Sequence, residues 1–146
     1  FKYYIGLSDV AVTACPCASR ELEKEFEKIL NLSSLKKELP IATHTQRCIV
    51  KLIVQRKMFD RLNLGKLLKL VEDSSSSYTL DELNRKGEVR LILQALRNEK
   101  FSEDVVRNIV GKLREMGVKG VWAYVSAESL ESFHNFNLRA VFKGVL

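Results

Sequence analysis

Two cysteines, two histidines and a few carboxylates supply the residue types with which this sequence could bind a metal or catalyse a reaction. Cys15 and Cys17 flank Pro16 in the segment VTACPCASRE, which follows an apolar alternating run. In an extended segment, residues i and i+2 face the same side, so both thiols can point into one cavity. The histidines of the chain, His44 and His134, lie in the polar stretches ATHTQR and ESLESFHNFN. A thiolate, imidazole nitrogens and a carboxylate form a plausible ligand shell for mononuclear zinc, iron or manganese.

Each of these residues also has an explanation without chemistry. Small cysteines fill space where a strand meets a helix, which would account for Cys15 and Cys17. Three cysteines in all, an odd number, argue against a disulfide framework. Metal binding, catalysis and burial therefore all stay open for Cys48 as well. Histidines in polar connections can equally serve as surface or hydrogen-bonding groups.

Two carboxylates stand where predicted elements begin. Glu88 follows Gly87 at the start of a predicted strand, and Glu103 lies in the first turn of the best-defined helix. An acidic side chain in a first helical turn stabilises the helix dipole, which is a sufficient reason for Glu103. Glu88 can similarly be an exposed carboxylate at a strand end. Neither residue type nor position decides between these interpretations and a functional one.

The composition is that of one globular domain. The chain has 146 residues, of which 46% are hydrophobic and 29% charged, enough to bury a core without disulfides. No apolar run approaches the roughly 20 residues of a membrane span, and the N-terminus lacks a signal-peptide pattern. We therefore expect a cytoplasmic protein and, since no Met begins it, a piece of something longer. A net charge of +6 suits an anionic partner such as a nucleotide phosphate, a nucleic acid or an acidic protein.

The hydrophobic pattern alternates between strand and helix periods. It predicts helices at residues 20–31, 62–71, 80–87 and 101–117, the last with Ser102 as N-cap and Gly117 as its stop. Thr79 and Glu82 form a capping box for the short third helix. The serine tract, residues 74–77, is interpreted as a flexible loop. Strands are predicted at residues 5–13, 48–54, 88–96, 118–125 and 138–145. This order indicates an α/β or α+β sandwich with helices packed on a sheet.

Five segments, taken in order along the chain, resemble the GTP cyclohydrolases of type IB, most closely their archaeal branch. They are TACPCAS, LPIATHTQR, LVEDSSSSY, GEVRLILQALRNEKFSEDVVR and ESLESFHNFNLRA. The resemblance implies an α+β tunnelling fold (T-fold), in which an antiparallel sheet is backed by helices and units assemble into oligomeric barrels. It also implies that residues 1–146 are a single T-fold-like domain, equivalent to the second half of a family chain. Active sites would then lie at interfaces of a homo-oligomer.

The resemblance also implies roles for individual residues. Cys15, His44, Glu88 and His134 would surround one divalent metal, with Cys15, His44 and His134 counted as catalytic. Fe2+ is the expected ion, and Zn2+ or Mn2+ accept the same ligands. Glu103, in FSED, matches the carboxylate that anchors the guanine base through its ring and exocyclic N–H groups.

The implied reaction is the hydrolytic opening of the guanine imidazole ring of GTP at C8. Formate would leave, and a 7,8-dihydroneopterin (cyclic) phosphate would form, as the first step of pterin biosynthesis toward methanopterin or folate. Arg47, Lys51 and Lys143 are candidate phosphate contacts by charge and position. Glu99 and Phe136 depart from the family pattern, in which a proline and a second histidine are common.

Two other functions stay open. The chain can be a non-catalytic or degenerate T-fold subunit that needs a partner chain, or a basic nucleic-acid-binding module. The second requires aromatic residues interleaved with basic ones on a strand face. Because Trp122 and Tyr124 lie in an uncharged strand, we expect no nucleic-acid partner, and we expect no membrane partner.

Overall fold

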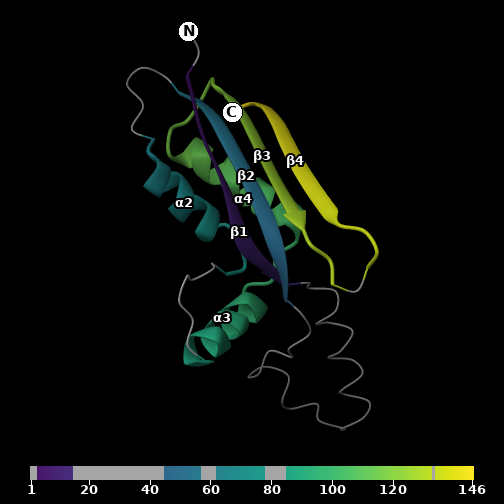
Figure 1. The fold of residues 1–146 in the computed structure, drawn as a ribbon. Helices are drawn as coiled ribbons and strands as arrows, with labels where there is room; N and C mark the ends of the chain where they lie inside the picture. Colours follow the sequence, from purple (N-terminus) through teal and green to yellow (C-terminus); the bar gives the residue numbers. More distant parts are fainter. Residues whose placement is uncertain (1–2, 15–44, 57–61, 78–84, 133) are drawn as a thin grey trace, which may run out of the picture.

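The computed structural model describes residues 3–14, 45–56, 62–77, 85–132 and 134–146. They form an antiparallel sheet with the strand order β1-β2-β3-β4 and helices against one of its faces (Figure 1). The described helices all belong to the connection between β2 and β3. This arrangement confirms an α+β fold with an antiparallel sheet backed by helices. The elements are β1 (Tyr3–Ala14), β2 (Thr45–Arg56), α2 (Leu64–Glu72), α3 (Arg85–Arg97), α4 (Ser102–Glu115), β3 (Trp122–Ser129) and β4 (Leu138–Val145).

Alternation along the central strands separates a buried face from an exposed one. On β2, Cys48, Val50, Leu52 and Val54 are fully buried, whereas the intervening Lys51 is exposed. Successive side chains of a strand point to opposite faces, so one face of the sheet meets the helices and the other faces outward. The pairing of β2 with β3 places three small or branched residues of β3 on the same inner face: Ala123, Val125 and Ala127.

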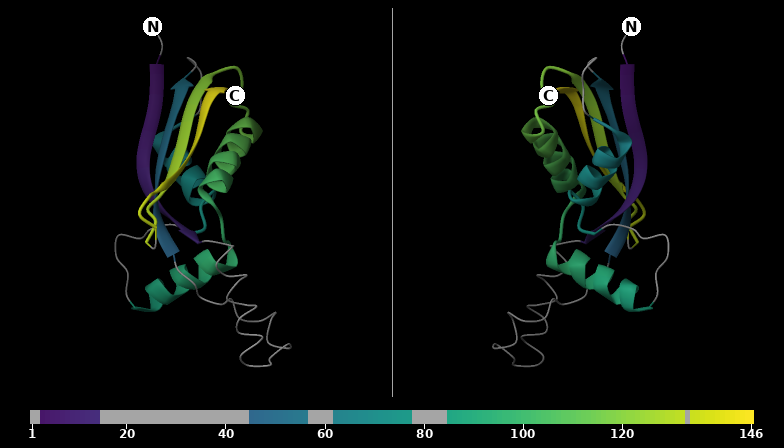
Figure 2. Two further views of the ribbon diagram at one scale, coloured as in Figure 1. Left: turned by 90° about the vertical axis from the view of Figure 1, so that its right-hand side faces the viewer. Right: turned by 90° about the vertical axis from the view of Figure 1, so that its left-hand side faces the viewer.

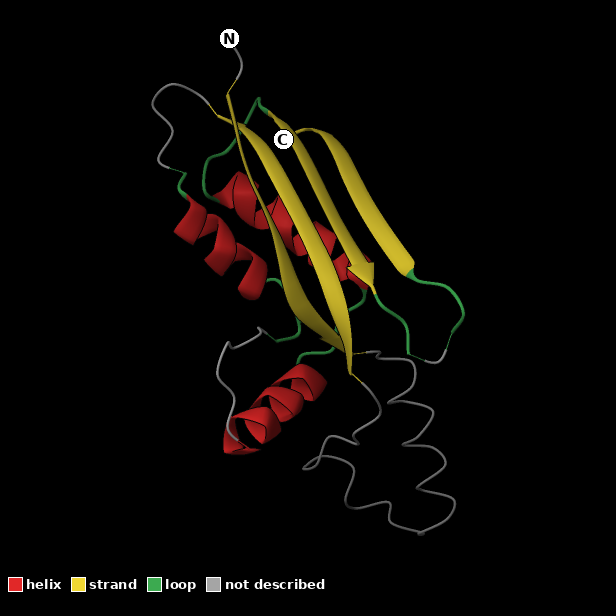
Figure 3. Cartoon of the chain, in the orientation of Figure 1, coloured by secondary structure: helices red, strands yellow, loops and turns green. Residues whose placement is uncertain are grey.

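Helices α2 and α4 cover the inner face of the sheet (Figures 2 and 3). Leu67 of α2 and Ile109 and Leu113 of α4 are fully buried in the same core cluster as the strand residues. The N-cap of helix α4 is Phe101, one residue before the predicted Ser102, which is already helical. Its end is as predicted, with Gly117 at φ 81°, a value that favours glycine. Within the described ranges, no helix combines the length and the apolar character needed to cross a membrane.

The strand predicted at residues 88–96 is wrong, because these residues belong to helix α3. Ala95 and Leu96 are buried against Val12 and Ala14 of β1, while Ile92 and the rest of the apolar run stay largely exposed. The run EVRLILQAL contains Leu, Gln, Ala, Arg and Glu, all good helix formers. A short apolar run cannot be assigned to helix or strand by periodicity alone. Glu88 is therefore an exposed residue of a helix and not the first residue of a strand.

Other sequence predictions differ by smaller amounts or are not tested. Helix 62–71 and strands 5–13, 48–54 and 138–145 are confirmed with small shifts at their ends. Strand β3 starts at Trp122, four residues later than predicted, and extends to Ser129. Gly87 lies inside α3 rather than ending a helix. The predicted helix 20–31 and the capping-box residues Thr79 and Glu82 lie outside the described residues.

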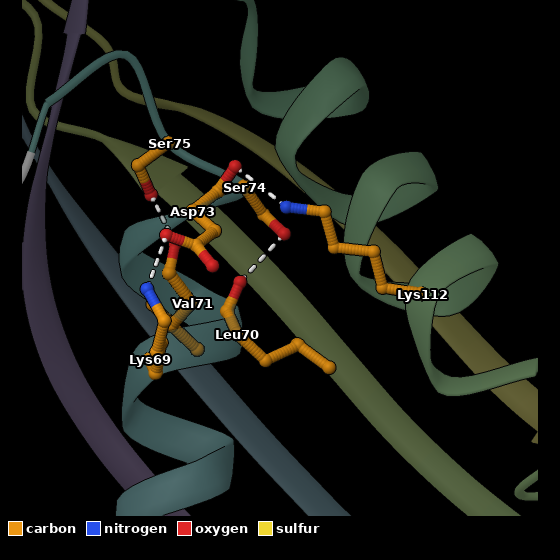
Figure 4. A network of polar contacts seen from close by, with 7 residues as sticks. All are labelled: Lys69, Leu70, Val71, Asp73, Ser74, Ser75 and Lys112. Carbon is orange, nitrogen blue, oxygen red and sulfur yellow. Dashed lines mark hydrogen bonds and ion pairs between the residues drawn. The ribbon is translucent and has the colours of Figure 1, made fainter. Parts of the chain in front are cut away.

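The serine tract, residues Ser74 to Ser77, is buried, which differs from the flexible loop predicted for it. Ser74 Oγ donates to the Leu70 carbonyl at 2.6 Å, and Ser75 Oγ donates to the Val71 carbonyl at 2.9 Å (Figure 4). The Ser74 hydroxyl thus pairs with a carbonyl near the end of α2, and the Ser75 hydroxyl adds to the bond that the Val71 carbonyl accepts from Ser74 N–H at 3.1 Å.

Two lysines and β1 hold the same region. Lys112 Nζ, from α4, donates to the Asp73 carbonyl at 2.7 Å, and Lys69 Nζ lies 3.1 Å from Asp73 Oδ1 (Figure 4). Beyond them, the main-chain N–H groups of Ser76 and Ser77 both donate to the Val12 carbonyl of β1. The serine tract is therefore a fixed part of the fold that ties α2 to β1.

Candidate active-site cleft

A cleft of about 300 Å³ opens where one end of the sheet meets the start of α4. This volume is at the lower end of the range for small-molecule sites. The sheet contributes Thr13, Gln46, Ser129 and Leu138 to its lining. The start of α4 and the residues before it contribute Lys100, Phe101, Ser102 and Glu103. The connection between β3 and β4 contributes Glu131, His134 and Phe136.

The strands bring polar groups to the cleft through their register. Thr13 pairs with Gln46 across β1 and β2, and Thr13 Oγ1 lies 3.5 Å from Ser129 Oγ of β3. All three side chains belong to buried residues. The next pair in this register, Ala14 with Thr45, is the last described on these two strands. The cleft is thus next to the strand ends that precede Cys15 and follow His44 in the sequence.

The start of α4 places a carboxylate at the mouth of the cleft. Phe101 N–H donates to Asp104 Oδ2 at 3.0 Å, so the first turn is capped by Asp104. Glu103, its neighbour, is exposed and lines the cleft instead. Ser102 Oγ is buried and makes no hydrogen bond of normal geometry to the described residues. Its polar neighbour is the Cys48 thiol, which is a weak partner.

The connection between β3 and β4 places an imidazole on the same cleft. The rings of His134 and Phe136 are stacked, with centroids 5.2 Å apart and planes inclined by 17°. Gln46 Nε2 donates to Glu131 Oε2, and Glu131 N–H donates to Asn137 Oδ1 at 3.2 Å. These bonds attach the connection to β2 and to its own far end, so the imidazole is presented from an anchored segment.

Of the site residues predicted from the sequence, the structure brings Glu103 and His134 together on one cleft. Arg47 and Lys51 are exposed on β2 and alternate with buried residues, so they lie on the outward face of the sheet. Lys143 is on the same outward face, beside Tyr124.

The predicted metal ligands are described only in part. Glu88 is exposed on α3, and Cys15 and His44 lie outside the described residues. In the described part of the chain, no group of three or more His, Cys, Asp or Glu residues could hold a metal ion.

The structure resolves the alternatives for Cys48 in favour of burial. Its side chain is fully buried in the core, and this burial raises the pKa of the thiol from 9.0 to about 11. Contacts with Ser102 and with the Glu128 main chain oppose the shift only in part. Since the thiolate is the form that binds metals and attacks substrates, Cys48 is inert in both respects near neutral pH.

Lys100 is the cation of the cleft lining, and it is half-buried. Burial lowers the pKa of its ammonium group, and the nearby Lys112 ammonium lowers it further, while Asp104 and Asp73 act in the opposite direction. Lys100 Nζ donates to the Ser75 carbonyl at 2.8 Å. The charge is therefore held against the serine tract.

Several residues of the cleft were not singled out by the sequence analysis. They are Thr13, Gln46, Lys100, Ser129 and Glu131. All of them belong to the segments that carry the resemblance: TACPCAS begins at Thr13, LPIATHTQR contains Gln46, GEVRLILQALRNEKFSEDVVR contains Lys100, and ESLESFHNFNLRA contains both Ser129 and Glu131. The segments themselves were thus the available signal for these residues.

The fold and the cleft together define a class of protein: an α+β domain whose helix-backed sheet ends in a cleft of about 300 Å³ lined by a carboxylate and an imidazole. Residues 1–140 match the family described as type I GTP cyclohydrolase folE2. The chain belongs to this family.

Curated relatives agree with the family match. The chain is similar to a GTP cyclohydrolase MptA of Thermoplasma acidophilum, 38% identical over 146 residues, which cover 95% of this chain and 49% of the relative. It is also similar to GTP cyclohydrolase MptA of Methanosphaera stadtmanae, 31% identical over 118 residues, 76% of this chain and 38% of the relative. The enzyme of that name from Methanococcus maripaludis is 30% identical over 120 residues, 77% of this chain and 38% of the relative. The chain thus spans less than half the length of these relatives.

Proposed function

We propose that this chain forms the guanine-binding part of a metal-dependent GTP cyclohydrolase. The proposed reaction opens the guanine imidazole ring at C8, releases formate and yields a 7,8-dihydroneopterin (cyclic) phosphate at the start of pterin biosynthesis. The observation that carries the proposal is that one cleft is lined by both Glu103, from α4, and His134, from the β3–β4 connection. Membership of the cyclohydrolase family supports the same activity.

Glu103 is the proposed base-recognition residue. A carboxylate accepts hydrogen bonds only, which suits the adjacent ring N–H and exocyclic NH₂ donors of guanine. It lies in the first turn of α4, where an acidic side chain is favourable for the helix. An analogue that lacks one of these donors leaves the carboxylate partly unsatisfied, which gives selectivity for guanine.

His134 is the proposed acid–base and ligand residue. Its imidazole is exposed on the cleft and is oriented by stacking on Phe136. An imidazole can exchange protons near neutral pH, so a group at this place can transfer a proton to or from a substrate. Phe136 itself cannot do so, and His134 is therefore the one imidazole that the β3–β4 connection supplies.

A divalent metal is part of the proposal. Cys15, His44, Glu88 and His134 would hold it, and this set of thiolate, imidazole and carboxylate donors suits Fe2+ as well as Zn2+ or Mn2+. When bound, such an ion makes hydroxide available at neutral pH by lowering the pKa of water. The register that leads β1 and β2 to the cleft supports Cys15 and His44 as members of this set.

The proposed assembly is a homo-oligomer of T-fold units. Its sites would lie at interfaces, and the outward-facing Arg47, Lys51 and Lys143 would then be available for the phosphates of GTP bound to a neighbouring unit. Family membership supports this assembly, as does the antiparallel sheet with α2 and α4 against one face. Size measurement by analytical ultracentrifugation, with and without GTP, tests it, and a monomer under both conditions would contradict it.

The proposed function is tested with the purified protein loaded with Fe2+ under anaerobic conditions. Incubation with GTP is expected to release formate and a fluorescent pterin after oxidation of the product. Glu103→Gln is expected to raise the KM for GTP, whereas Glu115→Gln, near the end of the same helix, is expected to leave KM unchanged. Equal KM values for all three proteins would exclude Glu103 as the guanine anchor.

A second candidate function is a non-catalytic T-fold subunit that needs a partner chain. The observation that favours it is Phe136, which stands beside His134 where a second imidazole is common in the family. Metal analysis distinguishes the two candidates. Stoichiometric metal that is lost in a Cys15→Ala, His134→Ala double variant, together with no pterin from GTP, would favour the subunit.

A further inference from the structure

Lys100 lines the cleft and connects three parts of the molecule. Its main-chain N–H donates to the Ala14 carbonyl at the end of β1, at 3.2 Å. Its ammonium group donates to the Ser75 carbonyl of the serine tract, at 2.8 Å. Glu103, three residues further along the chain, lies in the first turn of α4 and lines the cleft. One residue therefore joins β1, the serine tract and the start of α4.

The serine tract is itself fixed to β1, which makes it a firm anchor for Lys100. Ser76 N–H donates to the Val12 carbonyl at 3.1 Å, and Val12 N–H donates to the Ser77 carbonyl at 3.3 Å. Asn98 adds to this anchor, because its Nδ2 donates to the carbonyls of Ser75 and Ser76 at 3.1 Å each. The short segment before α4 is thus held to the serine tract through both Asn98 and Lys100.

The ammonium group of Lys100 anchors the segment before α4 and is not directed at a ligand in the cleft. Its ammonium group bonds to a carbonyl of the serine tract, which does not line the cleft. The groups that act on its charge, Lys112, Asp104 and Asp73, likewise belong to α4 and the end of α2 and do not line the cleft. Lys100 thus acts on the cleft through the segment that carries Glu103.

We propose that Lys100 is a positioning residue that fixes the start of α4 against β1 and so holds the Glu103 carboxylate where it can select guanine. The proposal rests on the proposed role of Glu103 in guanine recognition. Without the ammonium bond to Ser75, the segment before α4 keeps the Asn98 side-chain bonds and the main-chain bond of Lys100 to Ala14, but it loses the side-chain tie nearest to Glu103. The carboxylate is then held less firmly at its distance from the base. Small misplacements of a binding group are enough to reduce selectivity strongly.

The experiment measures the dissociation constants of GTP and of inosine triphosphate, which lacks the exocyclic amino group. The wild type is expected to prefer GTP by about tenfold or more, as for a hydrogen bond to a charged group. Lys100→Met keeps the chain length but removes the ammonium group, and it is expected to lose most of this preference. Lys100→Arg restores a cationic donor and is expected to recover part of it. The ratio of the two constants is informative because a smaller folded fraction would weaken both nucleotides equally.

Lys112→Met is the matched control. Lys112 also donates its ammonium group to a main-chain carbonyl at the end of α2, that of Asp73 at 2.7 Å, but it has no tie to β1. This variant is expected to keep the wild-type preference. If Lys100→Met does not fold, Lys100→Gln, which keeps one donor group, takes its place in the comparison.

The outcomes separate the proposal from the function on which it rests. A wild type that does not distinguish the two nucleotides overturns both the role of Glu103 and that of Lys100. A wild type that prefers GTP, together with a Lys100→Met variant of unchanged preference, overturns the positioning role alone. Equal losses in Lys100→Met and Lys112→Met also overturn it, because they would reflect a general weakening of the end of α2.

Discussion

Raising the pH above 9 is expected to destabilise the fold through Cys48. The thiol has a pKa of 9.0 when unfolded and about 11 in the fold, because burial disfavours the thiolate. Between these values the unfolded chain has already released its proton while the folded chain still holds it. Stability therefore falls as the pH rises through this window. At about pH 10.5 the loss is roughly 2 kcal/mol, and its ceiling at higher pH is roughly 3 kcal/mol.

The contribution of Cys48 is isolated by comparing the wild type with Cys48→Ala. Urea unfolding followed by tryptophan fluorescence gives the free energy of unfolding at about pH 8 and pH 10.5. At the lower pH the variant is expected to be less stable by about 1 kcal/mol or more, because it leaves a small cavity in the core. At the higher pH the wild type alone loses the additional 2 kcal/mol or so, and the order of stability is expected to reverse.

Other groups also titrate in this range, but they are the same in both proteins and cancel in the difference. A difference in stability that stays constant between the two pH values would refute the reasoning. It would mean that the Cys48 thiol ionises as easily in the fold as in the unfolded chain. Cys48 would then again be open to a role as a thiolate.

Three further substitutions test the packing around the helices and strands, each by urea denaturation. Gly111→Ala is expected to stabilise the protein by about 0.5–1 kcal/mol, because a Cβ there meets no atom within 4 Å and alanine is the better helix former. Gly6→Ala is expected to destabilise it by about 1–3 kcal/mol, because its Cβ would lie 2.9 Å from the Leu52 carbonyl oxygen of β2. Asn98→Ala is expected to cost about 1–2 kcal/mol, because the Ser76 carbonyl loses the amide donor at 3.1 Å.

Each of these has a contrary outcome. No gain from Gly111→Ala would place the middle of α4 in contact with another part of the protein. An unchanged Gly6→Ala variant would mean that β1 can move away from β2 at this position. Gln94→Ala, in helix α3 just before Asn98, is the control for the loss of a side chain. If Gln94→Ala and Asn98→Ala destabilise the protein equally, the bond from Asn98 to the Ser76 carbonyl is excluded as the cause.

The sequence was sufficient to predict those helices and strands whose structure follows from their own local residue pattern. Cys48 to Val54 is a short, mostly apolar run rich in Val and Ile, and helix α4 combines an apolar face with acids at its start and glycine at its end. Both were predicted correctly. The run at residues 88–96 was assigned to the wrong element because, within this run, the helix buries Ala95 and Leu96 and leaves most of the other apolar residues exposed. Such a helix lacks the clear amphipathic pattern that identifies others.

The cleft was predicted only in part, for a similar reason. Glu103 and His134 were found through motif segments, but Thr13, Gln46 and Ser129 become neighbours only through the pairing of three strands. Strand register is not visible in a local pattern of residues. For the same reason, the sequence did not predict that Lys51 lies on the outward face, which follows from the pairing of the strands in the sheet.

The serine tract has a consequence for covalent regulation. A run of four serines beside an acidic residue resembles a substrate for protein kinases, which require an extended and accessible hydroxyl. Here the hydroxyls of Ser74 and Ser75 are enclosed and already engaged by helix carbonyls, and each of the four residues is at most 2% exposed. A phosphate group could be attached only after this part of the fold had opened. Phosphorylation of the tract would therefore report on local unfolding and would prevent its reversal, rather than act as a signal on the native protein.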